Sequence, residues 1–354
     1  MFQEFNNVYI TNISSCIPKN KVENSYFSAL LSEKETKVFE KTVGIKSRRW
    51  ADHHVTASDL GCEAAKDVLD GKDYSKVKCL IFLSQTSDYK IPFTSNILQD
   101  KLNLPKETLC IDINAGCAGF VQGLSMAFAM ANTLAEDENV LIIIGETLSK
   151  ILSPYDKATN MLFGDAASAI LVAKSSKIGK SYFNFCSDGG AHEAIIISEG
   201  GYRNPSVFEA FEKNEDGTYD NKNLYLKMQG GKVFDFTLRE VAPSIKNLMT
   251  HFNLDIQDID GLFLHQSNRF IIKQISNLLG VDQTKVAINI EEFGNTSGVS
   301  IPLLLNTELW KFEHKSRILC SGYGSGLNWG NCLLDLSLTH FHTVKEYNEG
   351  INFT

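Results

Sequence analysis

The sequence predicts an α/β fold in which one strand-and-helix unit occurs twice. Short apolar runs of strand length alternate with longer helix-like segments, a rhythm that is typical of βαβ units and mostly parallel sheet. The second half of the chain then repeats the order of the first half at a nearly constant offset. A length of 354 residues allows one large domain or two ordinary ones, and 43% hydrophobic with 21% charged residues indicates a globular protein with ample core material.

Four apolar runs of the first half are expected to be strands, namely CLIFLSQ, LCIDIN, NVLIIIGE and SAILVAKS. The segment FTSNILQDKLNL is expected to be a helix, with Ser95 as a candidate cap. Small and apolar residues at helical spacing predict a second helix that begins at Cys117. By number, the expected strands are 79–85, 109–114, 139–146 and 168–175, and the expected helices are 93–104 and 117–134.

The second half follows the same order. FLSQTS matches FLHQSN, which places Ser84 opposite His265, 181 positions later. DINAGCAGFV matches NIEEFGNTSGV, which places Cys117 opposite Asn295, 178 positions later. The similar offsets favour a duplicated α/β unit, although generic βαβ rhythm is the competing explanation. Here the expected strands are 261–268, 285–290, 316–324 and 331–338, and the expected helices are 270–281 and 294–310.

The organisation that follows has two halves and a segment between them. Residues 1–186 form the half with Cys117, residues 187–228 form a surface excursion, and residues 229–354 form the half with His265 and Asn295. The stretch 187–236 is rich in glycine, asparagine and charge and lacks a clear period, so it is a candidate binding lid. A decorative insertion explains the same composition equally well.

Composition and termini exclude several classes of protein. A net charge of −8 and a pI of about 5.6, with no basic stripe, argue against nucleic-acid binding. The first residues, MFQEFNNVYITNISS, lack a basic and an apolar region, so no signal peptide is expected. Apolar runs such as VLIIIG are too short to span a bilayer, so we expect no membrane association and a cytoplasmic location.

Cys117 differs from the other cysteines by its context. None of the eight cysteines forms a Cys-x-x-Cys pair or a zinc-like spacing, so we expect reduced thiols and no metal site. Cys117 lies in NAGCAG, where an expected strand becomes an expected helix. A helix N-terminus lowers the pKa of a thiol, and glycines allow close approach of a substrate. The alternative is a small core residue.

His265 and Asn295 are expected to converge on Cys117. His265 ends its strand, where α/β sheets place ligands, and Asn295 occupies the turn equivalent to that of Cys117. Each also has a structural explanation, as a hydrogen-bonded polar residue and as a helix cap or turn residue. Together they suit one chemistry: Cys117 holds an acyl group as a thioester, while His265 and Asn295 donate hydrogen bonds to a second thioester and stabilise an enolate as carbon dioxide leaves.

The glycine-rich stretch SGYGSGLNWG, residues 321–330, follows an expected strand. It does not fit Gly-x-Gly-x-x-Gly, and a strand follows it, so a dinucleotide site is disfavoured. Such a loop can present a backbone N–H to an oxyanion, or it can be a simple hairpin turn.

Six motifs in order resemble the β-ketoacyl-acyl carrier protein synthase III family of the thiolase superfamily, and the resemblance covers about residues 8–338. They are DINAGCAGFVQGL, LFGDAASAILV, LKMQGGKVFDF, FLHQSN, FGNTSGVSIPLLL and GYGSGLNWG, and VGIKSRRW at 43–50 fits as well. The resemblance implies a thiolase-like, five-layered α/β/α/β/α duplication with pseudo-twofold symmetry, normally a homodimer. It implies an acyltransferase that condenses an acyl group with malonyl-acyl carrier protein, uses acyl-CoA or acyl-carrier thioesters, and needs no cofactor.

The family's functional positions can be carried over to this chain. Cys117 matches the acyl-accepting nucleophile, and His265 and Asn295 match the family's histidine and asparagine. The oxyanion hole would use the backbone N–H of Cys117 and that of Ser325, where the family usually has glycine. Substrate or carrier contacts would fall at Asn268, Arg269 and Ile91.

Three departures from the family pattern concern the substrate. The Trp and Arg that hold the coenzyme A adenine are missing from VFEKTVGI, and the basic residue after the HQ-x-N motif is displaced to Arg269. Ile91 stands where a Phe often reaches into the partner's acyl pocket. We therefore expect a starter other than acetyl, delivered on a carrier protein, in a specialised pathway.

Three alternatives use parts of the same pattern. An acyltransferase without decarboxylation is one, but such relatives often carry an acid at the position of Asn295. A silent acyl-binding subunit is another, although Cys117, His265 and Asn295 are all present. A papain-like protease shares the order Cys, His, Asn but requires a Cys-Gly-Ser-Cys-Trp context that is absent.

Overall fold

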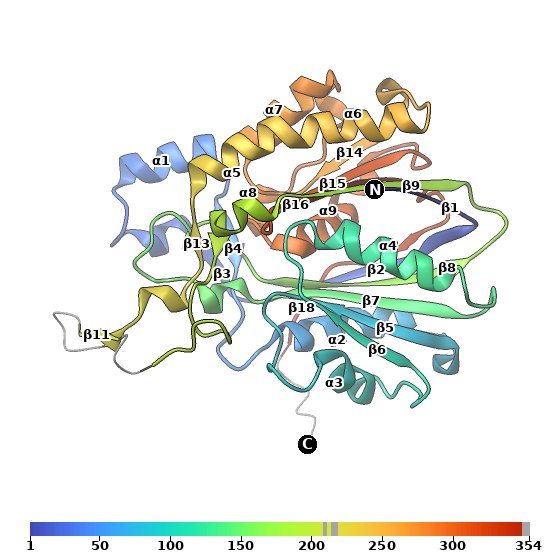
Figure 1. The fold of residues 1–354 in the computed structure, drawn as a ribbon, viewed down its shortest axis with the longest axis horizontal. Helices are drawn as coiled ribbons and strands as arrows, with labels where there is room; N and C mark the ends of the chain where they lie inside the picture. Colours follow the sequence, from blue (N-terminus) through green and yellow to red (C-terminus); the bar gives the residue numbers. More distant parts are fainter. Residues whose placement is uncertain (208–210, 214–218, 349–354) are drawn as a thin grey trace.

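The computed structural model describes residues 1–207, 211–213 and 219–348, and its elements lie in five layers (Figure 1). Parts of the expected 187–228 excursion and of the last half, residues 208–210, 214–218 and 349–354, lie outside the described residues. The expected α/β/α/β/α architecture is confirmed. From the bottom of Figure 1 upward, the layers are α2 (Ala57–Leu69) with α3 (Thr94–Lys101), a first sheet, α4 (Gly119–Ala131) with α9 (Ser300–Glu308), a second sheet, and α6 (Ala242–His251) with α7 (Arg269–Leu279).

The first sheet is covered by helices on both faces, which explains why its strands are continuous apolar runs. Strand β7 is buried along nearly its whole length. Its neighbours β5 and β8 pair with it in parallel and antiparallel orientation, respectively. The order is β17 (His340–Phe341), β2 (Val8–Ile17), β8 (Ala166–Lys174), β7 (Asn139–Glu146), β5 (Val77–Leu83) and β6 (Leu109–Ile113), and β18 (Lys345–Glu346) also pairs with β2.

The second sheet repeats the pairing pattern of the first. In each sheet two antiparallel pairings are followed by one parallel pairing: β2-β8-β7-β5 corresponds to β9-β16-β15-β14. Helices α4 and α9 occupy equivalent places in the two units, as do α2 and α6, so the predicted duplication is confirmed. The second sheet runs β1 (Phe2–Asn6), β9 (Lys180–Ser187), β16 (Asn328–Leu334), β15 (Ile318–Gly324) and β14 (Gly261–Leu264).

The expected strand 285–290 is wrong. Only Val286 makes a parallel bridge, with Leu262, at the place where β6 pairs with β5 in the first unit. A 3₁₀ turn at Gln283–Lys285 precedes it, and α8 (Ile290–Phe293) takes the last residue into a helix that buries Ile290 and Phe293. The alternating apolar residues of this stretch therefore pack into the core, but only one of them pairs with a neighbouring strand.

The expected helices 294–310 and 93–104 are shorter in the structure. The first starts only at Ser300, because Ser297 has a φ of +51° and donates its backbone N–H to the side chain of Asn295. In the second, α3, Ser95 is not the cap. The carboxylate of Asp112 instead accepts the first free backbone N–H groups, those of Thr94 and Ser95.

Both chain termini cross to the opposite half. Strand β1, at the N-terminus, pairs with β9 in the second sheet, whereas β17 and β18, near the C-terminus, pair with β2 in the first sheet. The expected boundary after residue 186 falls inside β9, near its end. Strand β9 therefore already belongs to the second sheet.

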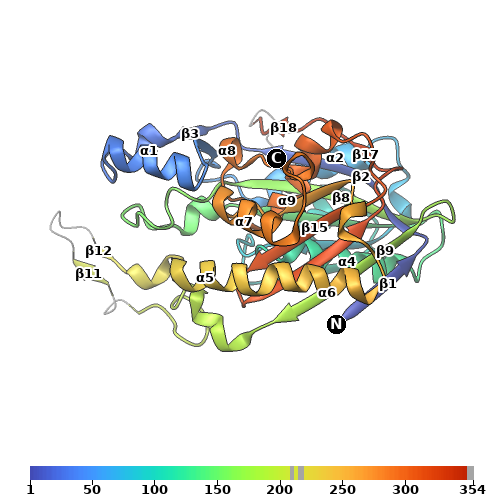
Figure 2. The ribbon, with the colours of Figure 1, turned by 90° about the horizontal axis from the view of Figure 1, so that it is seen from above.

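The remaining elements lie at the left side of Figure 1. Helix α5 continues through a π-helical segment, Thr237–Val241, into α6, and the two form one long rod in Figure 2. Three short strand pairs accompany them among the described residues. These elements are α1 (Glu33–Thr42), α5 (Gly230–Phe236), β3 (Lys21–Glu23) with β4 (Ser47–Arg49), β10 (Ile195–Ile196) with β13 (Lys227–Met228), and β11 (Glu212–Lys213) with β12 (Tyr219–Asp220).

Candidate active site

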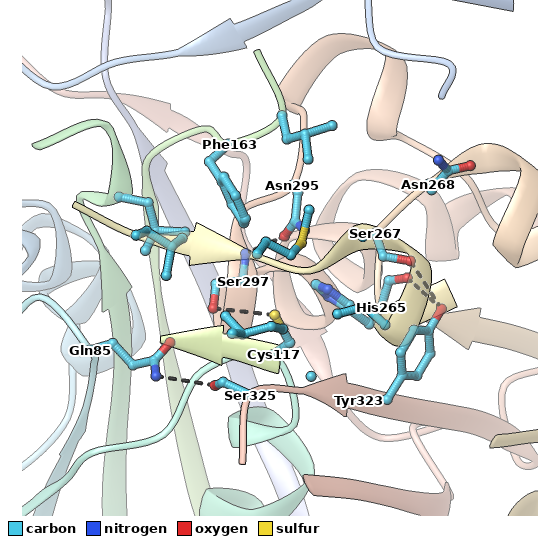
Figure 3. Close-up of a pocket in the computed structure, with 18 of the residues that line it drawn as sticks. Gln85, Cys117, Phe163, His265, Ser267, Asn268, Asn295, Ser297, Tyr323 and Ser325 are labelled. Carbon is cyan, nitrogen blue, oxygen red and sulfur yellow. Dashed lines mark hydrogen bonds between the residues drawn. The ribbon is translucent and has the colours of Figure 1, made fainter. Parts of the chain in front are cut away.

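Cys117 lies in the short turn between β6 and α4, at the centre of Figure 3. The backbone of β15 passes directly against it. A Cβ atom at Gly324 would lie 2.6 Å from the Cβ of Cys117 and 3.0 Å from its Sγ. Glycine at this position therefore allows the second sheet to approach the thiol, and the contact joins the two duplicated units at the site.

His265 follows the end of β14 and contacts a serine that the sequence did not single out. Its Nδ1 lies 2.6 Å from the Oγ of Ser300, the first residue of α9. The same Oγ accepts the backbone N–H of Gln266 at 3.4 Å, so its own proton is available for Nδ1. With the hydroxyl donating to Nδ1, the ring proton lies on Nε2, which makes that nitrogen a donor.

Burial lowers the pKa of His265 to about 3, because water no longer solvates the imidazolium. The ring is therefore neutral at physiological pH. A neutral ring with its proton on Nε2 donates a hydrogen bond without adding a positive charge. Such a group can polarise a carbonyl oxygen in the cavity.

Asn295 is held by both its side chain and its backbone. Its Oδ1 accepts the backbone N–H of Ser297 at 2.9 Å, so the amide NH₂ is the side-chain group left to donate into the cavity. Its backbone N–H donates to Leu162, and its carbonyl accepts from Gly164. Ser297 also places its Oγ 3.6 Å from the Sγ of Cys117.

Arg48 packs against the glycines next to the turn that holds Asn295. Its guanidinium is buried and donates to the carbonyl of Met161 at 2.6 Å and to the side chain of Asn24 at 2.8 Å. Cβ atoms at Gly164 and Gly294 would each lie 3.2 Å from the Cβ of Arg48. Burial lowers the pKa of Arg48 to about 10, but the side chain stays charged at neutral pH.

The thiol itself is neutral in the resting chain. Burial raises the pKa of Cys117 to about 12, the Ser297 hydrogen bond lowers it, and the Glu146 carboxyl raises it further. Burial also raises the pKa of Glu146 to about 8, although Ser84, Gln85 and Thr86 donate to it. Glu146 is therefore mostly protonated at neutral pH. Attack by Cys117 must coincide with loss of its proton.

A cavity of about 370 Å³ brings the three expected catalytic residues together. Ser325 and Asn268 line it as well, and Asn268 also caps α7 by accepting the backbone N–H groups of Phe270 and Ile271. The segment between the two halves supplies part of an apolar wall. Those apolar residues are Ile195, Ile196, Ile197, Leu226 and Met228.

Arg269 and Ile91 do not line this cavity. The guanidinium of Arg269 pairs with Glu291 at 2.8 Å, and its side chain packs where a Cβ at Gly44 would be, 2.7 Å away. Ile91 is 81% exposed on the loop between β5 and α3. In this single chain, neither side chain therefore belongs to the cavity that contains Cys117.

Sequence reasoning did not identify Ser300, Ser297, Tyr323 or Gln85 as parts of the site. The hydroxyl of Tyr323 donates to the carbonyl of His265 at 3.2 Å and lies 3.4 Å from the Oγ of Ser267 (Figure 3). Ser297 lies within the matched motif FGNTSG, which was a usable signal. Ser300, Tyr323 and Gln85 also lie within the quoted stretches FGNTSGVSIPLLL, GYGSGLNWG and FLSQTS, but their contacts with the site could not be read from them.

Replacing Ser300 by alanine is expected to slow decarboxylation by ~10-fold while acylation of Cys117 stays near the wild-type rate. Without the hydroxyl, the ring proton is free to move to Nδ1, and Nε2 then no longer donates. Each half-reaction would be measured in single turnover from pH 5 to 8. Because the pKa of His265 is about 3, the wild type should show no loss from ring protonation in this range.

Ser300→Thr keeps a hydroxyl and should restore decarboxylation. A purely structural role would slow both half-reactions equally, and that outcome would contradict the assignment of the tautomer to Ser300.

The described residues contain neither a membrane-spanning helix nor a metal-binding cluster. No helix among them is long and apolar enough to cross a membrane. Within the same ranges, no group of three or more His, Cys, Asp or Glu side chains is placed to hold a metal ion. All eight cysteines are free thiols.

Comparison with known proteins identifies the family. The sequence-family model described as "3-Oxoacyl-[acyl-carrier-protein (ACP)] synthase III" matches residues 111–189, and the family model of the C-terminal part matches residues 249–336. A β-ketoacyl-[acyl-carrier-protein] synthase III of Clostridium novyi (strain NT) is 33% identical over 332 residues, which are 93% of this chain and 98% of that relative. The chain belongs to the β-ketoacyl-[acyl-carrier-protein] synthase III family.

A further relative and two solved structures are similar to this chain. A relative from Clostridium perfringens (strain SM101) is 33% identical and covers 93% of this chain and 99% of itself. The crystal structure of a 3-oxoacyl-(acyl-carrier protein) synthase from Burkholderia xenovorans LB400 superposes with a TM-score of 0.89 at 31% identity, over 98% of this chain and 99% of that one. The priming β-ketosynthase of the R1128 polyketide pathway shares the fold, with a TM-score of 0.79 at 24% identity, over 93% of this chain and 97% of that one.

Proposed function

We propose that this synthase III family member catalyses a decarboxylating Claisen condensation. Its products would be β-ketoacyl-carrier thioesters for fatty-acid or specialised acyl-chain synthesis. The observation that carries the proposal is the convergence of Cys117, His265 and Asn295 on one cavity, with a nucleophile on one side and two neutral donors on the other. The names of the relatives, which are synthases that act on acyl-carrier proteins, support it.

The first half-reaction is transfer of the starter acyl group. The Sγ of Cys117 attacks the carbonyl carbon of an acyl thioester, loses its proton, and expels the donor thiol as the old C–S bond breaks. Backbone N–H groups of Cys117 and Ser325 are the candidate oxyanion hole for the tetrahedral intermediate. The acyl group then remains on Cys117.

The second half-reaction forms the carbon–carbon bond. The bond between the malonyl methylene and its carboxylate breaks, carbon dioxide leaves, and the electron pair forms an enolate. Nε2–H of His265 and the NH₂ of Asn295 donate to the enolate oxygen. The enolate carbon attacks the acyl-Cys117 carbonyl, and the Cys117 thiolate leaves and is reprotonated.

The decisive experiment follows carbon dioxide and acyl transfer together. The purified chain would receive malonyl-carrier protein with a starter acyl group on either coenzyme A or a carrier protein. One carbon dioxide per β-ketoacyl product supports the proposal, and higher activity with the carrier-bound starter would support the expected donor. Acyl transfer to an acceptor without carbon dioxide release would instead indicate a non-decarboxylating acyltransferase. Absence of any acyl adduct on Cys117 would indicate a silent subunit.

We also propose that the chain is a homodimer joined along β6. This strand ends the first sheet, and among the described residues it pairs only with β5, so one edge offers unpaired backbone groups. Two large apolar side chains are exposed on it and on α4, which follows it in the chain: Leu109 is 48% and Met126 is 55% exposed. Such an edge is typically covered by another strand.

In light scattering, the wild type should have about twice the chain mass of 39.4 kDa. The double variant Leu109→Glu/Met126→Glu should shift to the monomer, because each chain would bring two charges that have to be desolvated at the interface. Leu278→Glu, at an equally exposed leucine of α7, is the matched control and should stay dimeric. A wild-type monomer at micromolar concentration would contradict the proposed dimer.

A further inference from the structure

A second cavity of about 740 Å³ adjoins the cavity of the thiol. The two share lining residues, including Gln85 and Ser325, and the second lies between β6, the start of α4 and the N-terminal strand. Its other walls are largely apolar. They include Met1, Ile113, Ala115, Met126 and Phe185.

Gln85 and Ser325 come from opposite units and join at the boundary of the two cavities. The Nε2 of Gln85, after β5, donates to the Oγ of Ser325, after β15, at 3.2 Å (Figure 3). The backbone N–H of Gln85 is fixed by the carboxyl oxygens of Glu146 at 3.2 and 3.3 Å. The pair is therefore anchored on one side by the buried end of β7.

The pair also lies against the residue that precedes the nucleophile. A Cβ at Gly116 would lie 2.2 Å from the Oε1 of Gln85 and 3.1 Å from the Oγ of Ser325. In Figure 3 the pair stands on one side of Cys117, while His265 and Tyr323 stand on the other. An acyl chain that extends from the Sγ of Cys117 away from His265 meets the Gln85–Ser325 hydrogen bond before it reaches the second cavity.

We propose that Gln85 and Ser325 form a wall that confines the starter acyl group to the first cavity and so selects short chains. The inference rests on the proposed function, since it assumes an acyl group on Cys117. In this single chain Gln85 is exposed and its hydrogen bond to Ser325 is open to solvent. A longer aliphatic chain would have to separate the two side chains and displace water from them, and its methylene groups offer no polar partner in exchange. Without the pair, the chain would continue into a larger space that ends at Met126, on the surface proposed for the dimer contact.

The test uses a series of straight-chain acyl thioesters from two to twelve carbons and measures the rate of Cys117 acylation by intact-protein mass spectrometry. The wild type should acylate Cys117 faster with four carbons than with ten or twelve. Ser325→Gly retains the backbone N–H but removes the hydroxyl, and Gln85→Ala removes the other partner. Each single variant, and the double variant, should raise the rate for ten carbons relative to four by at least ~10-fold.

Gln122→Ala is the matched control, because Gln122 lines the second cavity without joining the pair, and its profile should stay wild-type. If the Gln85 and Ser325 variants are acylated with the same dependence on chain length as the wild type, the proposed wall is wrong. It is also wrong if the wild type accepts twelve carbons as readily as four. Failure of every chain to acylate Cys117 in all proteins would overturn the proposed function itself, and the wall with it.

Discussion

Replacing Cys117 by alanine is expected to abolish acyl transfer and condensation, with a loss of roughly 10⁴-fold or more in turnover. The residue supplies the sulfur that holds the acyl group, and the other side chains that line the cavity contain one other sulfur atom, the inert thioether of Met228. Intact-protein mass spectrometry after incubation with an acyl donor measures the adduct directly. The variant should show none.

Cys186→Ala is the matched control for this experiment, because Cys186 is a partly exposed thiol on β9 that does not line the cavity. It should acylate at the wild-type rate. An adduct that persists in Cys117→Ala would place the nucleophile elsewhere. In the wild type, alkylation of Cys117 by iodoacetamide should accelerate up to at least pH 10, because its pKa of about 12 keeps the thiol neutral at lower pH.

The second large effect is expected for Asn295→Asp, which should slow decarboxylation by ~10²- to 10³-fold. The amide donates to the enolate oxygen, whereas a carboxylate only accepts and adds a negative charge beside a developing one. The new Oδ1 still accepts the backbone N–H of Ser297, so the turn should be retained. Acylation of Cys117 should fall by less than ~10-fold, since that step uses backbone donors.

Separate assays of acyl-adduct formation and of labelled carbon dioxide release test this division of labour. Asn132→Asp, at an exposed asparagine after α4, introduces the same charge away from the site and should change neither rate. An equal loss in both half-reactions of Asn295→Asp would show that the residue serves the fold or both steps alike.

The positions of Cys117 and Asn295 were predictable because they occupy equivalent turns of a duplicated unit, and that of His265 because it directly follows the buried apolar strand β14. Strand ends are local features, and the duplication brings equivalent turns together. The helical and strand character of long apolar segments was equally local. The length of α9 was not, since the Asn295–Ser297 hydrogen bond delays its start.

Contacts between distant segments were beyond prediction from one sequence. The cap of α3 comes from Asp112, the tautomer of His265 depends on Ser300, and Gln85 meets Ser325 across 240 positions. None of these pairs has a spacing that local propensity can recognise. The expected strand 285–290 is wrong for the same reason. Whether this segment forms a strand depends on its hydrogen-bond pairing with β14, which is limited to one bridge, and not on its own apolar pattern.

The crossed termini have a consequence for how the chain folds. The second sheet is completed by β1, from the beginning of this sequence, and the first sheet is completed by β17 and β18, from near its end. The first unit therefore cannot finish its sheet until the strands near residue 340 have been made, and the contacts that close the structure span nearly the whole sequence. Such high contact order favours slow folding and a single cooperative unfolding transition, despite the internal repeat that would otherwise allow two independent ones.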